Sequence, residues 1–165
     1  MVVSITWSAS QGGSAISSPL NWGNINVGAN STGDIFISHN GTEKIYDCSF
    51  YIAAYSGSYV GGADPATDLA ELQAWGDAGD GFAINQDLTG GFGTGTWVTH
   101  TTSAGTVSVP IMLDKDSQIS GPGSADGEIA VSVKHHVKLR ITVPSSEDTA
   151  GTRMFDQVFK FTYTS

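Results

Sequence analysis

The sequence predicts an all-β fold, an antiparallel β-sandwich that carries one short helix. Of the 165 residues, 39% are hydrophobic, 14% are charged and 21 residues are glycine. Turn-forming residues thus replace the Glu and Lys that cover long surface helices, which excludes a helical bundle. Short apolar runs recur between clusters of Gly, Ser, Asn and Asp, as in antiparallel sandwiches. No run approaches the roughly 18 apolar residues of a transmembrane helix, so no membrane partner is expected.

Eight apolar runs are interpreted as strands, because their hydrophobic residues alternate or form short continuous blocks. They cover residues 2–8, 20–27, 34–38, 44–55, 96–101, 106–113, 128–143 and 154–164. The pair Asn40-Gly41 is a strong hairpin signal, so it predicts a tight turn between the third and fourth runs. Residues 1–19 are expected to form an N-terminal strand or arm, because a polar stretch follows the first run.

One segment carries the start and stop signals of a helix at about residues 65–75. Asp64 suits the N-cap, Pro65 the first helical position, and Gly76 the C-terminal stop. Leu69, Leu72 and Trp75 recur about three apart and therefore share one face. We expect this helix to lie against the open edge or the end of the sandwich.

A glycine- and aspartate-rich segment, residues 76–95, is predicted to be an extended loop. It is too long for a passive turn, and long loops are often functional. Phe82 and Phe92 have no obvious core role there, so they are the candidate partner contacts; the alternative is that both fold back onto the domain. We therefore predict one domain over residues 1–165, with an arm at 1–19 and a loop at 76–95.

The sequence offers no catalytic constellation, so an enzyme is not expected. There is no G-x-S-x-G motif, and the single cysteine, Cys48, lies between apolar neighbours as a buried structural thiol does. His135 and His136 are adjacent on a predicted strand, so their side chains point to opposite faces and do not act together.

No cofactor is expected, and calcium is the alternative that the loop acids leave open. The formal net charge of -9 repels phosphate backbones, so nucleic acid is not an expected partner. Hard cations bind several oxygens, which three acidic segments offer. Their residues are Asp77, Asp80, Asn85 and Asp87; Asp114 and Asp116; Asp126 and Glu128. The EF-hand pattern fails at Gln118 and Ile119, which favours solvated turn acids.

Four tryptophans raise the alternative of a carbohydrate-binding module, since aromatic faces stack on sugar rings. Trp7, Trp22 and Trp97 lie in or beside predicted strands, and Trp75 lies on the apolar face of the helix. Core packing explains each of them more economically.

Two regions resemble Ig-like proteins of tailed-bacteriophage virions, such as capsid decoration (cement) proteins. The first is residues 19–31, a strand to Ser38 and then Asn40-Gly41-Thr42. The second is residues 137–144, a polar turn with Ala150-Gly151-Thr152 and the final aromatic strand. The resemblance implies an Ig-like β-sandwich with no catalytic residues, which binds an assembled shell through loops or an arm.

The function expected from this resemblance is a structural virion protein that decorates and stabilises the outer capsid surface. Its partners would be the major capsid protein or other virion proteins, and it would bind as a homo-trimer or a monomer. A tail-tube, baseplate or fibre component is the second hypothesis, and a carbohydrate-binding module is the third. The N-terminus has no basic segment followed by an apolar run, so we expect synthesis in the host cytoplasm and location in the virion.

Overall fold

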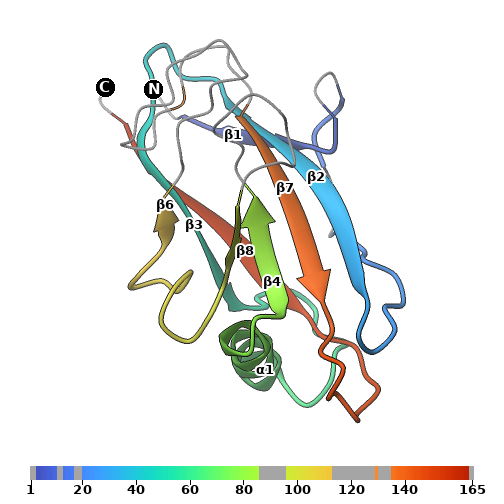
Figure 1. Cartoon of the computed structure of the whole chain (residues 1–165). Helices are drawn as coiled ribbons and strands as arrows, with labels where there is room; N and C mark the ends of the chain where they lie inside the picture. The colour runs from blue at the N-terminus through green and yellow to red at the C-terminus, as the bar shows by residue number, and fades with distance from the viewer. Residues whose placement is uncertain are drawn as a thin grey trace.

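Two antiparallel sheets stack face to face, and one short helix closes an end, which confirms the predicted β-sandwich (Figure 1). The structure, a computed structural model, describes residues 3–10, 13–16, 20–85, 96–112, 129 and 135–163. The five-stranded sheet has the order β1 (Ile5–Ser8), β2 (Asn30–His39), β7 (His135–Thr142), β4 (Gly81–Asn85), β5 (Trp97–Thr99). The three-stranded sheet has the order β6 (Ile111–Met112), β3 (Tyr46–Ala54), β8 (Phe155–Thr162).

The centre of the five-stranded sheet supplies one wall of the core. β2 and β7 pair antiparallel over eight residues, with Ile35 opposite Val137. Buried and half-buried residues alternate along β7 because every second side chain of a strand points to the same face. Ile35, Val137 and Leu139 are completely buried by this arrangement.

The three-stranded sheet supplies the opposite wall. Phe50 of β3 faces Phe159 of β8 across the ladder, and their ring centroids are 5.2 Å apart. The pairing shifts between Tyr46 and Ser49, where Asp47 adopts a φ of 49° that Asp tolerates better than most residues. The buried hydrophobic residues of the two sheets and the helix form one cluster.

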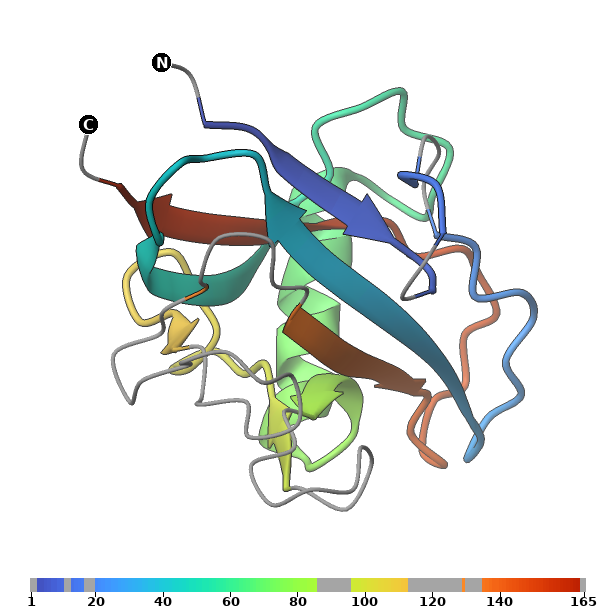
Figure 2. The ribbon, with the colours of Figure 1, turned by 90° about the horizontal axis from the view of Figure 1, so that it is seen from above.

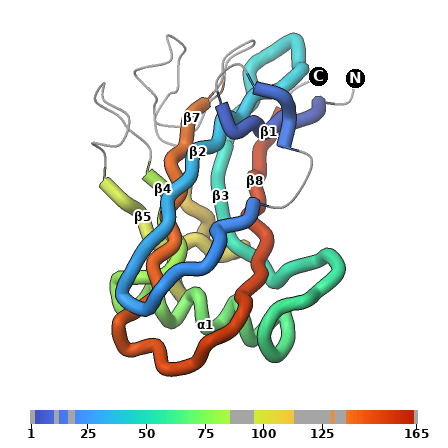
Figure 3. The backbone as a smooth tube through the Cα atoms, turned by 90° about the vertical axis from the view of Figure 1, so that its right-hand side faces the viewer, coloured from blue at the N-terminus to red at the C-terminus, as the bar shows by residue number. Residues whose placement is uncertain are grey.

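Helix α1 (Pro65–Asp77) lies across the end of the sandwich and packs against β3, β4 and β8, as Figures 2 and 3 show. The carboxylate of Asp64 accepts hydrogen bonds from the backbone N–H groups of Ala66 and Thr67, so the predicted N-cap is confirmed. Leu72 is completely buried. The helix includes Gly76 and Asp77, so it ends two residues later than the predicted helix 65–75. No helix within the described residues is long and apolar enough to cross a bilayer.

The hairpin prediction at Asn40-Gly41 is wrong, because β2 and β3 belong to different sheets. The chain crosses between the layers at this point. The side-chain oxygen of Asn40 accepts a hydrogen bond from the backbone of Ser4, and the backbone of Gly41 donates to Nδ1 of His39. These contacts fix a corner between the sheets.

Two further predictions change in the structure. Residues 20–27 form no strand, although Trp22 still packs against the core. The predicted loop 76–95 contains the C-terminal end of α1 and the strand β4, and residues 86–95 lie outside the described part of the chain. β4 has five consecutive buried residues, so it lacks the alternation that marks a strand facing solvent on one side.

Candidate functional site

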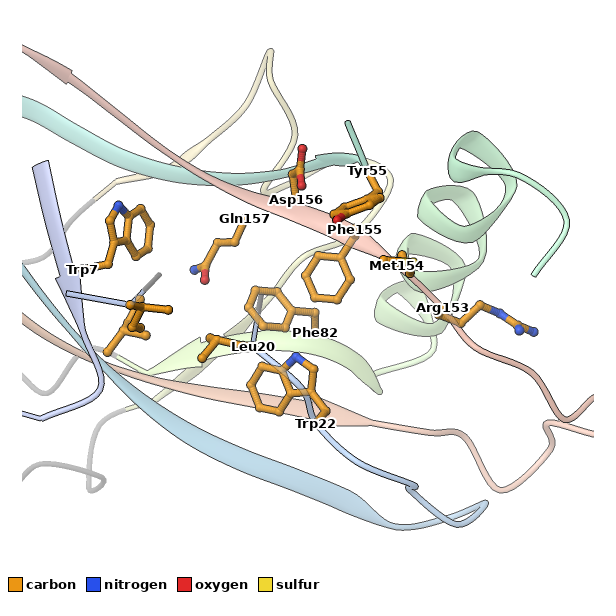
Figure 4. Close-up of a pocket in the computed structure, with 12 residues that line it drawn as sticks. Trp7, Leu20, Trp22, Tyr55, Phe82, Arg153, Met154, Phe155, Asp156 and Gln157 are labelled. Atoms are coloured by element: carbon orange, nitrogen blue, oxygen red, sulfur yellow. The ribbon is translucent and has the colours of Figure 1, made fainter. Parts of the chain in front are cut away.

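A cavity of about 320 Å³ opens between the two sheets on the side of β8 (Figure 4). Its walls come from five parts of the chain: β1 with the segment after it, β2, the end of β3, β4, and the start of β8 with the residues before it. The lining residues are Trp7, Ile16, Leu20, Trp22, Ile35, Tyr55, Phe82, Arg153, Met154, Phe155, Asp156 and Gln157. The cavity exists because the two sheets separate along this side.

Aromatic rings hold the cavity walls in place. The Phe82 ring centroid lies 6.2 Å from that of Trp22 and 4.9 Å from that of Phe155, so three rings from different elements meet. Trp7 contacts Phe159 edge to face at 6.1 Å, where β1 approaches β8. Such aromatic pairs are worth about 0.5–1.5 kcal/mol each beyond the area that they bury.

The polar side chains at the cavity differ in how their hydrogen-bonding capacity is used. Asp156 accepts hydrogen bonds from the backbone N–H and the hydroxyl of Ser56. Arg153 forms a two-armed ion pair with Glu71 of α1. Both side chains point away from the cavity in Figure 4, whereas Gln157 points into it. The buried Nε2 of Gln157 has no hydrogen-bond partner within the described residues.

A buried carboxylate beside the cavity ties α1 to the start of β8. Asp68 is 1% exposed and accepts hydrogen bonds from the Tyr59 hydroxyl at 2.9 Å and the backbone N–H of Met154 at 2.8 Å. Desolvation, followed by this hydrogen bond to Asp68, raises the pKa of Tyr59 to about 12. Asp68 therefore has a structural role, because its hydrogen bonds connect α1 to Tyr59 and to the residue before β8.

His100 packs against Phe82, a residue of the cavity wall, with their ring centroids 5.0 Å apart. It is completely buried, its Nδ1 donates to the carbonyl oxygen of Phe82 at 3.3 Å, and burial lowers its pKa to about 4. Gly105 has a φ of +71° and lies against the imidazole ring, where a Cβ would collide with it. The ring is therefore a packed, neutral core group.

The opposed orientation predicted for the two adjacent histidines is confirmed. His135 is buried, and desolvation, followed by the charge of His136, lowers its pKa to about 3. His136 lies on the other face, where it donates to Asp34 at 3.1 Å and stacks on Phe36. Cys48 is also completely buried, as predicted.

The two predicted contact phenylalanines have different outcomes. Phe82 lies in β4 and is 1% exposed, so the expectation of an exposed loop residue is wrong. It belongs to the core because the chain re-enters the sheet directly after α1. Phe92 lies outside the described residues.

The acidic segments considered for calcium are only partly described. Asp77 accepts hydrogen bonds from the backbone and the hydroxyl of Thr102, and Asn85 is completely buried in β4. The described residues contain no cluster of three or more His, Cys, Asp or Glu that could hold a metal ion. Asp80 is half-buried directly before β4. The remaining predicted oxygen donors lie outside the described part of the chain: Asp87, Asp114, Asp116, Asp126 and Glu128.

Trp7, Trp22 and Trp75 pack against the core as predicted, whereas Trp97 does not belong to that cluster. Trp7 and Trp22 contact the phenylalanines named above, and Nε1 of Trp75 donates to Glu147. The Arg140 guanidinium lies 4.4 Å from the ring centroid of Trp97. All four tryptophan residues are half-buried.

An ordered loop presents exposed aliphatic side chains that the sequence interpretation placed in a strand. Val107 and Val109 are 66% and 54% exposed. The backbone of Gly105 donates to the carbonyl of Val109 and accepts from Ile52 of β3, and the Thr106 hydroxyl accepts from the backbone of Val109. The loop is therefore fixed to the sheet while its two valines face solvent.

Comparison with known proteins adds no family assignment. No protein-family model matches the sequence, and no curated protein matches it either.

Proposed function

We propose that this chain is a non-enzymatic structural virion protein with an Ig-like sandwich, which decorates the outer surface of an assembled capsid. The observation that carries the proposal is the fixed loop with Val107 and Val109. Solvent-facing aliphatic side chains on a rigid loop favour association, because little conformational entropy is lost when they are buried. The resemblance of the two ends of the chain to Ig-like virion proteins supplies the kind of partner.

In the proposed mechanism each copy bridges neighbouring capsid subunits, as a monomer or as part of a homo-trimer. Burial of one valine side chain contributes at most about 1.5–3 kcal/mol, so a single loop binds weakly. Contacts repeated within a trimer and around a shell combine by multivalency. The bound copies then oppose expansion of the shell.

The charge of the chain supports an outward location. A net charge of -9 repels packaged nucleic acid and keeps unbound copies in solution. In this proposal the protein is synthesised in the host cytoplasm and then binds to the assembled shell.

The test combines the solution mass of the chain with binding to shells prepared without it. Light scattering gives the mass, and co-sedimentation with shells gives the number of copies bound. A monomer or trimer that saturates shells at a fixed copy number is the expected result. If the chain alone formed rings or tubes and did not bind shells, the result would favour a tail component over a decoration protein. Absence of both would overturn a virion role.

A charge substitution locates the contact. Val107→Asp with Val109→Asp is expected to weaken shell binding at least tenfold, because two carboxylates would have to be desolvated. Val27→Asp is the matched control, since Val27 is as exposed as Val109 but belongs to a different segment, the one before β2. Equal binding by the double variant and the control would contradict the assignment of this loop.

A further inference from the structure

We propose that the cavity between the sheets binds a neutral small molecule with one apolar ring and one hydrogen-bond acceptor. The inference does not depend on the virion proposal, because it rests on the cavity walls alone. Three properties of the cavity define the ligand: its size and aromatic lining, the state of its charged neighbours, and the buried amide of Gln157.

Size and lining select a compact apolar molecule. A volume of about 320 Å³ lies at the lower end of the range for small-molecule sites, which is roughly 300–1,000 Å³. Trp7 and Phe82 present rings to the space from the five-stranded sheet, Phe155 from the three-stranded sheet, and Trp22 from the segment before β2 (Figure 4). A single ring that packs edge to face against these walls makes the contacts that such aromatic groups favour.

The charged neighbours select a neutral ligand. The Arg153 guanidinium is satisfied by Glu71, and the Asp156 carboxylate is satisfied by Ser56. Both point away from the cavity in Figure 4. A charged ligand would therefore lose its hydration without gaining an opposite charge.

Gln157 selects a ligand with an acceptor. Its side chain enters the cavity from β8, and its buried Nε2 has no hydrogen-bond partner among the described residues. Nε2 itself is closed off from the cavity. Rotation of the amide group about its terminal bond would bring Nε2 to the cavity, where a ligand that supplies a carbonyl or hydroxyl oxygen satisfies a donor that is otherwise costly to bury.

Three probes of similar size separate these properties. Phenylacetamide is neutral and has an acceptor, toluene has none, and phenylacetate carries a charge. By NMR titration of the folded chain we expect phenylacetamide to bind several-fold more tightly than toluene and at least tenfold more tightly than phenylacetate. No saturable binding of phenylacetamide, or equal binding of phenylacetate, would overturn the proposal.

Two variant pairs tie the binding to the cavity. Gln157→Leu should reduce phenylacetamide affinity to that of toluene, and Gln73→Leu on α1 should leave it unchanged. Leu20 is 44% exposed, so Leu20→Trp fills the cavity without strain in the core and should abolish binding of all probes. Val27→Trp, on the same connecting segment but outside the cavity, should bind them normally. Unchanged binding in Gln157→Leu or Leu20→Trp would contradict the site.

A final experiment distinguishes two possible occupants of the cavity, a free small molecule and a side chain of a partner protein. If Leu20→Trp attaches to shells as well as the parent chain does, the cavity serves a free ligand, as proposed. If it loses attachment while Val27→Trp keeps it, a partner side chain occupies the cavity, and the small-molecule assignment is overturned. A chain that binds phenylacetamide but no shells would refute the virion role alone.

Discussion

Strands β7 and β8 have equal length, but their burial differs completely. Along β7 every second residue is buried, and Val137 and Leu139 are entirely inaccessible. Along β8 no residue is fully buried, although Phe155, Phe159 and Phe161 all pack against the core. β8 contains more aromatic residues than β7, so hydrophobicity alone does not decide which strand is enclosed.

Position in the sheet accounts for the difference. β7 lies between β2 and β4 and is covered by the second sheet, whereas β8 is an edge strand that pairs only with β3 among the described strands. The sheets separate on the side of β8, and its large rings line the resulting space (Figure 4). One side of the sandwich thus provides stability and the other provides a cavity.

Among single substitutions, the largest effect is expected in β7. Leu139→Ala removes a fully buried side chain and should lower the free energy of unfolding by about 3 kcal/mol. Val158→Ala on β8, a half-buried position, should cost less than about 1 kcal/mol. Denaturation in urea measures both variants. Equal losses would refute the contrast between the strands.

Acid should lower the free energy of unfolding because two histidines, His100 and His135, are buried. The pKa of His100 is lowered to about 4 and that of His135 to about 3, because burial disfavours the charged forms. The unfolded chain therefore takes up protons below about pH 6.5 that the folded chain does not, so stability is full above this pH and falls with acidification. Each histidine should cost about 2 kcal/mol between pH 7 and pH 5.

The variant His100→Gln tests this contribution, because it removes one titrating group. Urea denaturation at both pH values should show about half of the parent's loss. A loss as large as that of the parent chain would show that His100 does not carry the effect.

The tie between the helix and β8 should have an intermediate effect. Asp68→Ala leaves the backbone N–H of Met154 and the hydroxyl of Tyr59 without their acceptor, which should cost about 1–2 kcal/mol. Asp77→Ala, which removes exposed bonds to Thr102, is the matched control and should cost less than about 0.5 kcal/mol. Thermal or urea unfolding distinguishes them, and equal costs would remove Asp68 from its structural role.

The smallest effect is expected at the mouth of the cavity. Leu20→Ala removes a side chain that is 44% exposed and borders a space already open, so its cost should stay below about 1 kcal/mol. A loss as large as that of Leu139→Ala in the same urea experiment would mean that the cavity is closed in solution.

Local features of the fold were predictable, and pairings over long distances were not. The helix was predicted because Asp64, Pro65 and the spacing of Leu69, Leu72 and Trp75 are signals within one segment. The Asn40-Gly41 signal failed because a turn sequence does not state which strands pair across it. Phe82 was misplaced because β4 is buried on both faces and follows a glycine-rich stretch.

The candidate sites were less accessible to sequence reasoning. Trp7, Phe82 and Gln157 come from the beginning, the middle and the end of the chain, and no local pattern brings them together. Val107 and Val109 alternate with polar residues, which is typical of a strand, yet hydrogen bonds within their loop turn both outward. Only the tertiary structure determines which apolar residues are available for binding.

Amide hydrogen exchange with and without phenylacetamide tests the contrast between the two sides most directly. Without ligand, amides of β7 should exchange only by global unfolding, and those of β8 should exchange faster through local opening. Saturating phenylacetamide should slow exchange near Phe155 and Gln157 more than in β7. Equal protection of the two strands without ligand, or an equal response of both to it, would contradict a sandwich that is closed at β7 and open for binding at β8.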